Sequence, residues 1–122
     1  MDVPILKQRD YLIAMIQAVL TDEDLIRLRT RLVEQVGQHR SIGVILDVTG
    51  LDVMDSFSVR TLHDIAYMIR LRGAETVIVG IQPDVAFTMV QQGLRLQGVP
   101  TALDLEEGVL YLDEKVRKKA RL

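Results

Sequence analysis

Apolar side chains recur along this chain with two different spacings, and the two spacings alternate. Leu25, Leu28 and Leu32 follow one another at helical intervals, which places them on one face of a helix. Gly43–Val48 and Thr76–Ile81 are instead nearly continuous apolar runs, as in strands that are covered on both faces. Strands that alternate with helices predict an α/β layer fold with a largely parallel sheet.

The same patterns predict the order of elements, β-β-α-β-α-β-α-β-α. Strands are expected at Val3–Leu6, Tyr11–Ile16, Gly43–Val48, Thr76–Ile81 and within Pro100–Leu105. Helices are expected from Asp22 to about Gly37, from Ser56 to Arg72, from Pro83 through Leu94 and from Glu106 to about Lys119. Because only the first two strands lack a helix between them, we expect an N-terminal strand pair and a mostly parallel central sheet.

Residues at the helix ends and on the helix faces refine these limits. Thr21 is a suitable N-cap for the first helix, and acidic residues follow it in the first turn, where they are favoured. Gly73 suits the position just after the second helix. In the first helix the buried stripe continues to Val36 and is widened by Ile26 and Val33. The residues expected to face inward from the second helix are Phe57, Leu62, Ile65, Ala66 and Ile69.

Length and composition narrow the class of protein. The chain has 122 residues, 48% of them hydrophobic and none of them Cys, so a single domain over residues 1–122 can bury a core without disulfide bonds. The net charge of −2 excludes a global basic field that would attract nucleic acid. No segment approaches the roughly 20 apolar residues of a membrane span, and no cleavable signal sequence is recognisable. We therefore expect a cytoplasmic protein with neither a nucleic-acid nor a membrane partner.

Cations gather near the end of the chain and depart from this overall balance. They are Lys115, Arg117, Lys118, Lys119 and Arg121. Because cations are favoured at the negative pole of a helix dipole, one interpretation is a solvated helix end. The alternative interpretation is an electrostatic docking patch.

Few residues offer catalytic chemistry. The two histidines, His39 and His63, lack metal-ligand spacing, and no Gly-rich phosphate-binding loop is present. His63 follows Ser56 on the second predicted helix, but the Gly-x-Ser-x-Gly motif is absent and no orienting third group is evident. We therefore expect no enzyme activity, no cofactor and no metal site.

Three aspartates follow the central strand, at the sheet edge where open α/β folds usually place function. They are Asp47, Asp52 and Asp55. An aspartyl-phosphate receiver would place its phospho-accepting Asp there, but it also requires an acidic pair after its first strand and a Lys after a later one. Asp10 stands alone, and no Lys occurs between Lys7 and Lys115. The receiver interpretation is therefore disfavoured.

Two serines lie together at the start of the second predicted helix, Ser56 and Ser58. One interpretation is helix capping alone, in which Asp55 or a serine hydroxyl accepts from free backbone N–H groups. The other is a switch, because a phosphate on Ser56 would be favoured at a helix N-terminus. It would add a charge of about −1.5 to −2 beside Asp52 and Asp55. The residues alone leave both interpretations open.

The segment Val44–Leu62, VILDVTGLDVMDSFSVRTL, resembles the core signature of STAS domains, the SpoIIAA-like fold of anti-sigma-factor antagonists. In that family a strand ending in Asp leads to Asp-Ser at a helix start, and the phosphorylated serine corresponds to Ser56. Gly73–Pro83 and Thr101–Val109 resemble the later strands of the RsbS-like stressosome branch. Asp-Ser-Phe, in place of the Asp-Ser-Ser-Gly of many sporulation-type antagonists, also favours that branch. It leaves Ser58 as a second candidate phosphorylation site.

The resemblance implies a non-enzymatic scaffold and phospho-switch of the general stress response, within a large cytoplasmic assembly. The implied partners are a sensor-type STAS paralogue (RsbR-like), a serine kinase of the anti-sigma type (RsbT-like), a serine phosphatase (RsbX-like) and further copies of the chain. The unphosphorylated protein would hold the kinase, and phosphorylation would release it. Since about two residues precede the first predicted strand, we expect a stand-alone STAS subunit without the large N-terminal domain of the sensor-type paralogues.

Two alternatives remain within this picture. The chain could be a generic antagonist that binds an anti-sigma kinase, or a purely structural assembly subunit whose serines only cap the helix. In the switch interpretation, the three aspartates would support the surface around Ser56. The candidate partner contacts beside it are Arg60, His63 and Asp64, on the outer side of the second predicted helix.

Overall fold

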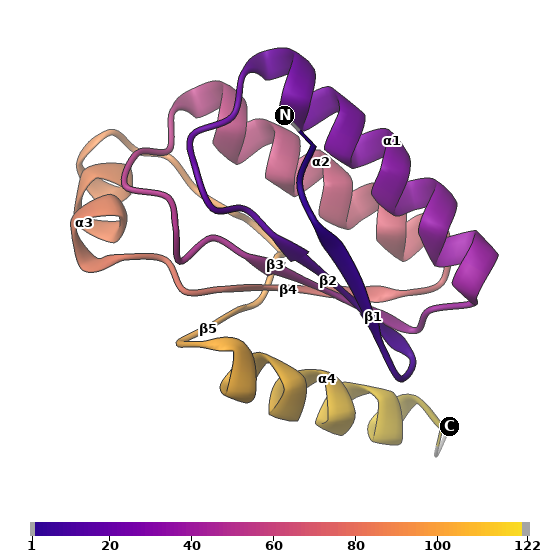
Figure 1. The fold of residues 1–122 in the computed structure, drawn as a ribbon. Coiled ribbons are helices and arrows are strands. Elements are labelled where there is room, and N and C mark those ends of the chain that lie inside the picture. Colours follow the sequence, from indigo (N-terminus) through magenta and orange to yellow (C-terminus); the bar gives the residue numbers. More distant parts are fainter. Residues whose placement is uncertain (1, 121–122) are drawn as a thin grey trace.

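Five strands form one mixed sheet with helices on both faces (Figure 1). The structure is a computed structural model, and it describes residues 2–120. The elements are β1 (Ile5–Gln8), β2 (Tyr11–Met15), α1 (Asp22–His39), β3 (Gly43–Asp47), α2 (Ser56–Leu71), β4 (Glu75–Val79), α3 (Pro83–Gln91), β5 (Thr101–Ala102) and α4 (Leu105–Ala120). The predicted order of strands and helices is confirmed.

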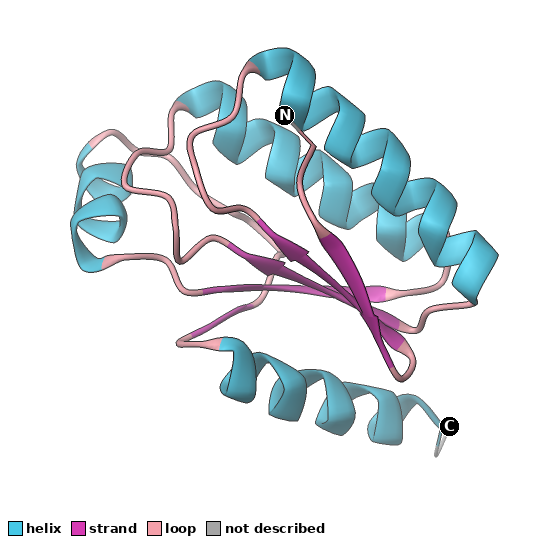
Figure 2. Ribbon diagram, viewed as in Figure 1, coloured by secondary structure: helices cyan, strands magenta, loops and turns pink. Residues whose placement is uncertain are grey.

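The strands lie in the sheet in the order in which they occur in the chain, β1-β2-β3-β4-β5. β1 pairs antiparallel with β2, and every other pair is parallel. The connections from β2 to α1, from β3 to α2 and from β4 to α3 therefore all begin at the carboxyl ends of these parallel strands. α3 lies beside the same end of the sheet (Figure 2). The expected fold class, a mostly parallel sheet with four helices and an N-terminal strand pair, is confirmed.

The sheet separates two hydrophobic cores. α1 and α2 lie side by side on one face, and α4 covers the other (Figure 1). Alternate residues of β3 serve the two cores, because successive side chains of a strand point to opposite faces. Val44 and Leu46 pack under α1 and α2, whereas Ile45 packs toward α4 with Val77 and Leu112. The prediction that β3 is covered on both faces is confirmed.

α4 approaches the sheet closely where it carries a glycine. A Cβ at Gly108 would lie 2.6 Å from Cγ1 of Val79, so no side chain fits there without a shift. Further along α4, Asp113 accepts a hydrogen bond from the Tyr11 hydroxyl of β2. Burial and this hydrogen bond raise the pKa of Tyr11 above the ordinary range of a phenol.

Several predicted limits were wrong by a few residues. β1 begins after Pro4 and continues to Gln8, because Arg9, with φ of 56°, makes the turn into β2. α1 passes through Gly37 and ends at His39, because Arg40 adopts the left-handed cap conformation. α3 ends at Gln91 and does not reach Leu94. Smaller differences place β2 at Tyr11–Met15, β3 at Gly43–Asp47, β4 at Glu75–Val79, β5 at Thr101–Ala102 and the start of α4 at Leu105.

The predicted inward faces were mostly right. Leu25, Leu28, Leu32 and Val36 are buried in α1, and Leu62, Ile65, Ala66 and Ile69 are buried in α2. Ile26 is 41% exposed and therefore does not widen the stripe of α1. Phe57 is only half-buried, and Val59 and Thr61 are buried instead. In the cationic cluster, Lys115, Arg117, Lys118 and Lys119 are exposed on α4, and Arg121 lies outside the described residues.

Candidate functional site

The loop between β3 and α2 leads to the two candidate serines, and it is fastened at several points. The carboxylate of Asp47, the last residue of β3, accepts the backbone N–H of Thr49 at 2.9 Å. The side chains of Leu51 and Met54 are buried in the core beneath α1 and α2. Asp52 and Val53 lie between them and are exposed. The loop is therefore an anchored segment that displays a few residues.

The neighbouring loops hold this segment from both sides. A Cβ at Gly50 would lie 2.6 Å from Cα of Gln17 in the β2–α1 connection, so this close approach requires a glycine. On the other side, the side-chain amide of Gln82 donates to the carbonyl oxygen of Thr49 at 2.6 Å. Gly80, with φ of 81°, lies directly against the Thr49 side chain. These contacts fix where α2 begins.

The N-cap of α2 is Asp55. Its carboxylate accepts the backbone N–H of Ser58 at 2.8 Å, which satisfies one of the free donors at the helix start. Hydrogen bonds from the backbone N–H and the hydroxyl of Ser58 lower the pKa of Asp55, because they favour the charged carboxylate. Ser58 is half-buried beside Leu25, Leu51 and Leu62.

Ser56 differs from Ser58 in each of these respects. It is the first residue of α2, it is exposed, and it takes no part in the cap. The capping interpretation named Asp55 or a serine hydroxyl as the acceptor. The structure shows that the acceptor is Asp55, so capping by a serine hydroxyl was wrong. Ser56 thus offers a free hydroxyl at a helix N-terminus.

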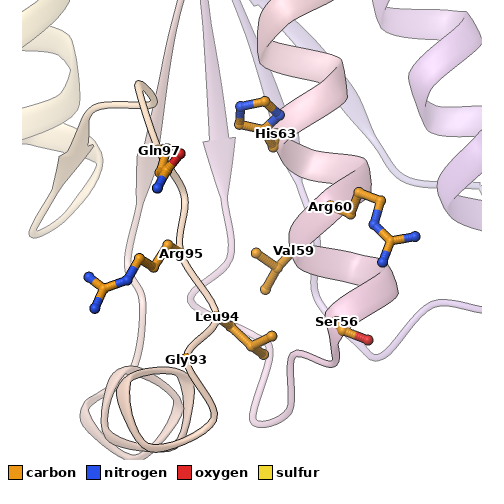
Figure 3. A pocket seen from close by; sticks show the side chains of 8 residues that line it. All are labelled: Ser56, Val59, Arg60, His63, Gly93, Leu94, Arg95 and Gln97. Carbon is orange, nitrogen blue, oxygen red and sulfur yellow. The ribbon is translucent and has the colours of Figure 1, made fainter.

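An open groove of about 390 Å³ runs beside Ser56, between α2 and the chain that follows α3 (Figure 3). The residues that line it are Ser56, Val59, Arg60, His63, Gly93, Leu94, Arg95 and Gln97. Val59 and Leu94 point toward each other across it, whereas the side chains of Ser56 and Arg60 both project to the outer side of α2 (Figure 3). The groove therefore has an apolar centre and basic margins.

The three candidate partner contacts lie on α2, as expected from the sequence. Arg60 is exposed, and His63 and Asp64 are half-buried. Nδ1 of His63 lies 3.6 Å from a carboxylate oxygen of Asp64, and the two form an ion pair when His63 is protonated. His63 and Ser56 both line the groove, but two helical turns, about 10 Å, separate them along the axis. A direct Ser–His hydrogen bond is therefore not formed.

The three candidate aspartates do not converge on one point. Asp47 binds the N–H of Thr49, Asp55 caps α2, and Asp52 is exposed between them. Asp10 lies in the turn between β1 and β2, at the opposite end of the parallel strands from these three aspartates. Among residues 2–120, no three His, Cys, Asp or Glu side chains are grouped so that they could hold a metal ion.

Sequence reasoning missed the far wall of the groove, Gly93–Gln97. It had assigned Leu94 to the third helix. The signal that marks the true end of α3 is Gly93, whose φ of 69° is a conformation that favours glycine. The chain turns there and runs back beside α2, a tertiary placement that no local pattern encodes.

A model of the STAS domain matches residues 3–108 of the chain. The chain belongs to the STAS family. Within residues 2–120, no helix of this STAS domain combines the length and the apolar character that a membrane crossing requires.

Two curated relatives from Bacillus subtilis strain 168 are RsbT co-antagonist proteins. RsbRA is 34% identical over 93 residues, which are 76% of this chain and 34% of the relative. RsbRD is 29% identical over 85 residues, which are 70% of this chain and 31% of the relative. The chain thus matches about a third of the length of these two proteins.

Solved structures match over nearly the whole chain. A serine-to-glutamate variant of RsbS from Moorella thermoacetica is 35% identical, with a TM-score of 0.80 over 94% of this chain and 97% of that one. A chain from a structure of the stressosome is also 35% identical, with a TM-score of 0.74 over 93% of this chain and 99% of that one. SpoIIAA in its unphosphorylated form shares the fold, with 16% identity and a TM-score of 0.67. The resemblance to the RsbS-like branch of the anti-sigma-factor antagonists is confirmed.

Proposed function

We propose that this STAS domain is a phospho-switched subunit of a stressosome. In its unmodified state it holds a serine kinase of the anti-sigma type, and phosphorylation of Ser56 releases that kinase. The observation that carries the proposal is that Ser56 is exposed at the first position of α2 while a different residue, Asp55, caps the helix. Ser56 is thus free for modification without loss of a structural contact.

The surroundings of the two serines favour Ser56 over Ser58. The Ser58 backbone N–H is bonded to Asp55 and its side chain packs beside Leu62, so a kinase would have to disturb the helix start to reach it. Ser56 requires no such change. A phosphate on Ser56 would also be favoured by the positive pole of α2.

Release follows from a change of charge on an anchored surface. The β3–α2 loop is held by the side chains of Leu51 and Met54 and by the contacts of Gly50 and Thr49. The backbone around Ser56 therefore has no need to move when the phosphate is added. A partner docked there would meet a new charge of about −1.5 to −2, and like-charge repulsion would raise its dissociation rate.

The proposed partners follow from the similarity to RsbS and to RsbT co-antagonist proteins. They are an RsbR-like STAS paralogue, an RsbT-like kinase, an RsbX-like phosphatase and further copies of this chain. We place this assembly in the cytoplasm, and we assign the chain no enzymatic activity and no cofactor. A generic antagonist of an anti-sigma kinase would use the same serine but would assemble without the RsbR-like paralogue.

Phosphorylation by the cognate kinase tests the proposal. With kinase and ATP, the wild-type protein should incorporate one phosphate, Ser56→Ala should lose most of the label, and Ser58→Ala should retain it. The label should resist hydroxylamine, which would remove it from an aspartyl phosphate. Ser56→Asp should bind the kinase more weakly than wild type. A wild-type protein that remains unlabelled, or label that persists in Ser56→Ala, would contradict the proposal.

A further inference from the structure

We propose that Arg60 is the counter-cation of a phosphate on Ser56, so that the modified serine and the guanidinium pair along the outer side of α2. The inference rests on the proposed function, because it concerns the modified state of Ser56. Beyond the proposed function, the inference names Arg60 as the residue that binds the phosphate. It also implies that phosphorylation removes the unpaired positive charge of Arg60 from the surface.

The helix geometry brings the two side chains together. Ser56 and Arg60 are four residues apart in α2, and side chains at this spacing are neighbours, with Cβ atoms about 5–6 Å apart. Helical side chains lean toward the N-terminus of their helix, so Arg60 leans over the turn that begins with Ser56. Both side chains project to the same outer side of α2, at the margin of the groove that both residues line (Figure 3).

Arg60 is available for this role. It is exposed, and within the described part of the chain it forms neither a hydrogen bond nor an ion pair. Two other arginines, by contrast, are engaged: Arg70 donates to the carbonyl oxygen of Gly98 at 3.0 Å, and Arg117 pairs with Glu114. Arg60 can therefore meet a phosphate without giving up a contact.

The other charged groups near Ser56 do not replace Arg60. They are Asp52 and Asp55 from the β3–α2 loop, His63 and Asp64 from α2, and Arg95 from the chain after α3. The Asp55 carboxylate is bonded to the Ser58 N–H, and His63 lies beside Asp64. Arg95 lines the groove from the opposite wall, and its guanidinium points away from α2 (Figure 3).

The chemistry of the pair is favourable. An anion that precedes a cation by four residues is the better orientation for a helical ion pair. A guanidinium also presents parallel N–H donors that match two phosphate oxygens. The pair would hold the phosphate against α2 and favour its dianionic form.

The pairing changes what a partner meets. Before modification, the outer side of α2 presents the Arg60 cation beside a neutral hydroxyl. After modification, it presents a phosphate dianion, and the cation is already paired. An acidic group of the partner that contacts Arg60 would lose its attraction and gain repulsion in the same step. Release is then stronger than the phosphate alone would cause.

A phosphorus NMR titration tests the pairing without any kinase. Phosphoserine is installed at position 56 during synthesis, and its second pKa, about 6 when unperturbed, is measured at low salt. We expect this pKa to lie about 0.2 to 0.4 units lower in the protein with Arg60 than in Arg60→Gln, with Arg60→Lys in between. Arg95→Gln, which removes a cation from the far wall, should leave it unchanged.

Two further comparisons decide the outcome. Phosphoserine at position 58, which is two residues from Arg60 and does not face it, should titrate alike with and without Arg60→Gln. Circular dichroism should show that the variants remain folded. Equal phosphate pKa values in the wild-type and Arg60→Gln backgrounds would overturn the inference. A kinase that ignores Ser56 would instead overturn the proposed function and leave this titration unaffected.

Discussion

The carboxylate of Asp55 accepts the backbone N–H of Ser58 at 2.8 Å, and the serine that lies between them in the sequence has no part in this bond. Asp55 therefore caps the helix, and the adjacent Ser56 is the candidate site of modification. Substitutions can remove one task and leave the other in place, so the structural and the regulatory interpretations of this segment can be tested independently.

Loss of the cap should destabilise the protein, whereas loss of the exposed hydroxyl should not. Asp55→Ala should lower the free energy of unfolding by about 1 kcal/mol, because the Ser58 N–H loses its acceptor. Ser56→Ala should change it by less than about 0.5 kcal/mol, as is usual at exposed positions. Urea titration measures both, and Asp55→Asn, which still caps, is the control. A Ser56→Ala protein that is as destabilised as Asp55→Ala would restore the serine-capping interpretation.

The same hydrogen bonds predict a dependence on pH. Because they lower the pKa of Asp55 in the folded protein, the stability they provide is fully present above the ordinary Asp value of about 4. It is lost as the pH falls through the lower, folded pKa. Between pH 5 and pH 2, wild type should therefore lose stability more steeply than Asp55→Asn. Parallel curves for the two proteins would show that Asp55 contributes nothing to acid sensitivity.

Because α4 lies so close to the sheet, we expect replacement of its glycine by alanine to lower the stability of the protein instead of raising it. Gly→Ala inside a helix ordinarily stabilises it by up to about 1 kcal/mol. At Gly108 the new Cβ would lie 2.6 Å from Cγ1 of Val79, and overpacking of this kind costs about 1–3 kcal/mol. Gly108→Ala should therefore destabilise the protein in thermal unfolding. In a Val79→Ala background, which removes that methyl group, the same change should become neutral or stabilising; destabilisation of equal size in both backgrounds would argue against the clash.

The phenol of Tyr11 should report on the contact between β2 and α4. Its pKa is raised by burial and by the hydrogen bond to Asp113, so the stability it provides is complete below the unfolded value of about 10 and lost as the pH rises above it. Tyr11→Phe should cost about 1 kcal/mol at neutral pH and should flatten the loss of stability above pH 10. It should also remove the latest-ionising component from the absorbance titration of tyrosine. Persistence of that component would assign it to a different residue.

The fold was predictable because its signals are local and periodic. The stripe of Leu25, Leu28 and Leu32 and the apolar run of β3 specify which side of each element is buried. The start of α2 was equally readable, because an aspartate beside two serines is a strong cap signal. The cap signal alone left the capping and switch interpretations open, and it was the resemblance to the STAS signature that pointed to Ser56, with Ser58 as the second candidate.

Glycine misled the sequence interpretation where its role was spatial. Gly37 was taken as the end of α1, but the helix continues and Arg40 adopts the left-handed conformation instead. A Cβ at Gly37 would lie 2.0 Å from a guanidinium nitrogen of Arg72, so this glycine leaves room for the exposed Arg72 side chain. The far wall of the groove was missed for a related reason, since the contact of Gly93–Gln97 with α2 exists only in the folded chain.

The strand order of the sheet, identical to the order of the chain, has a consequence for how the molecule assembles. Each strand after β1 finds the strand it pairs with already synthesised, so pairing requires little search among distant segments. The core beneath α1 and α2 can close once α3, which supplies Val85 and Met89, has followed β4, and the Gln82 side chain then also holds the loop that carries Ser56. The opposite face of the sheet stays uncovered until α4, the last helix described, packs on it. A nascent chain would thus expose the apolar side chains of this face, among them Ile13, Ile45 and Val77, until α4 is made, and chaperones that bind apolar strands would meet it on that side.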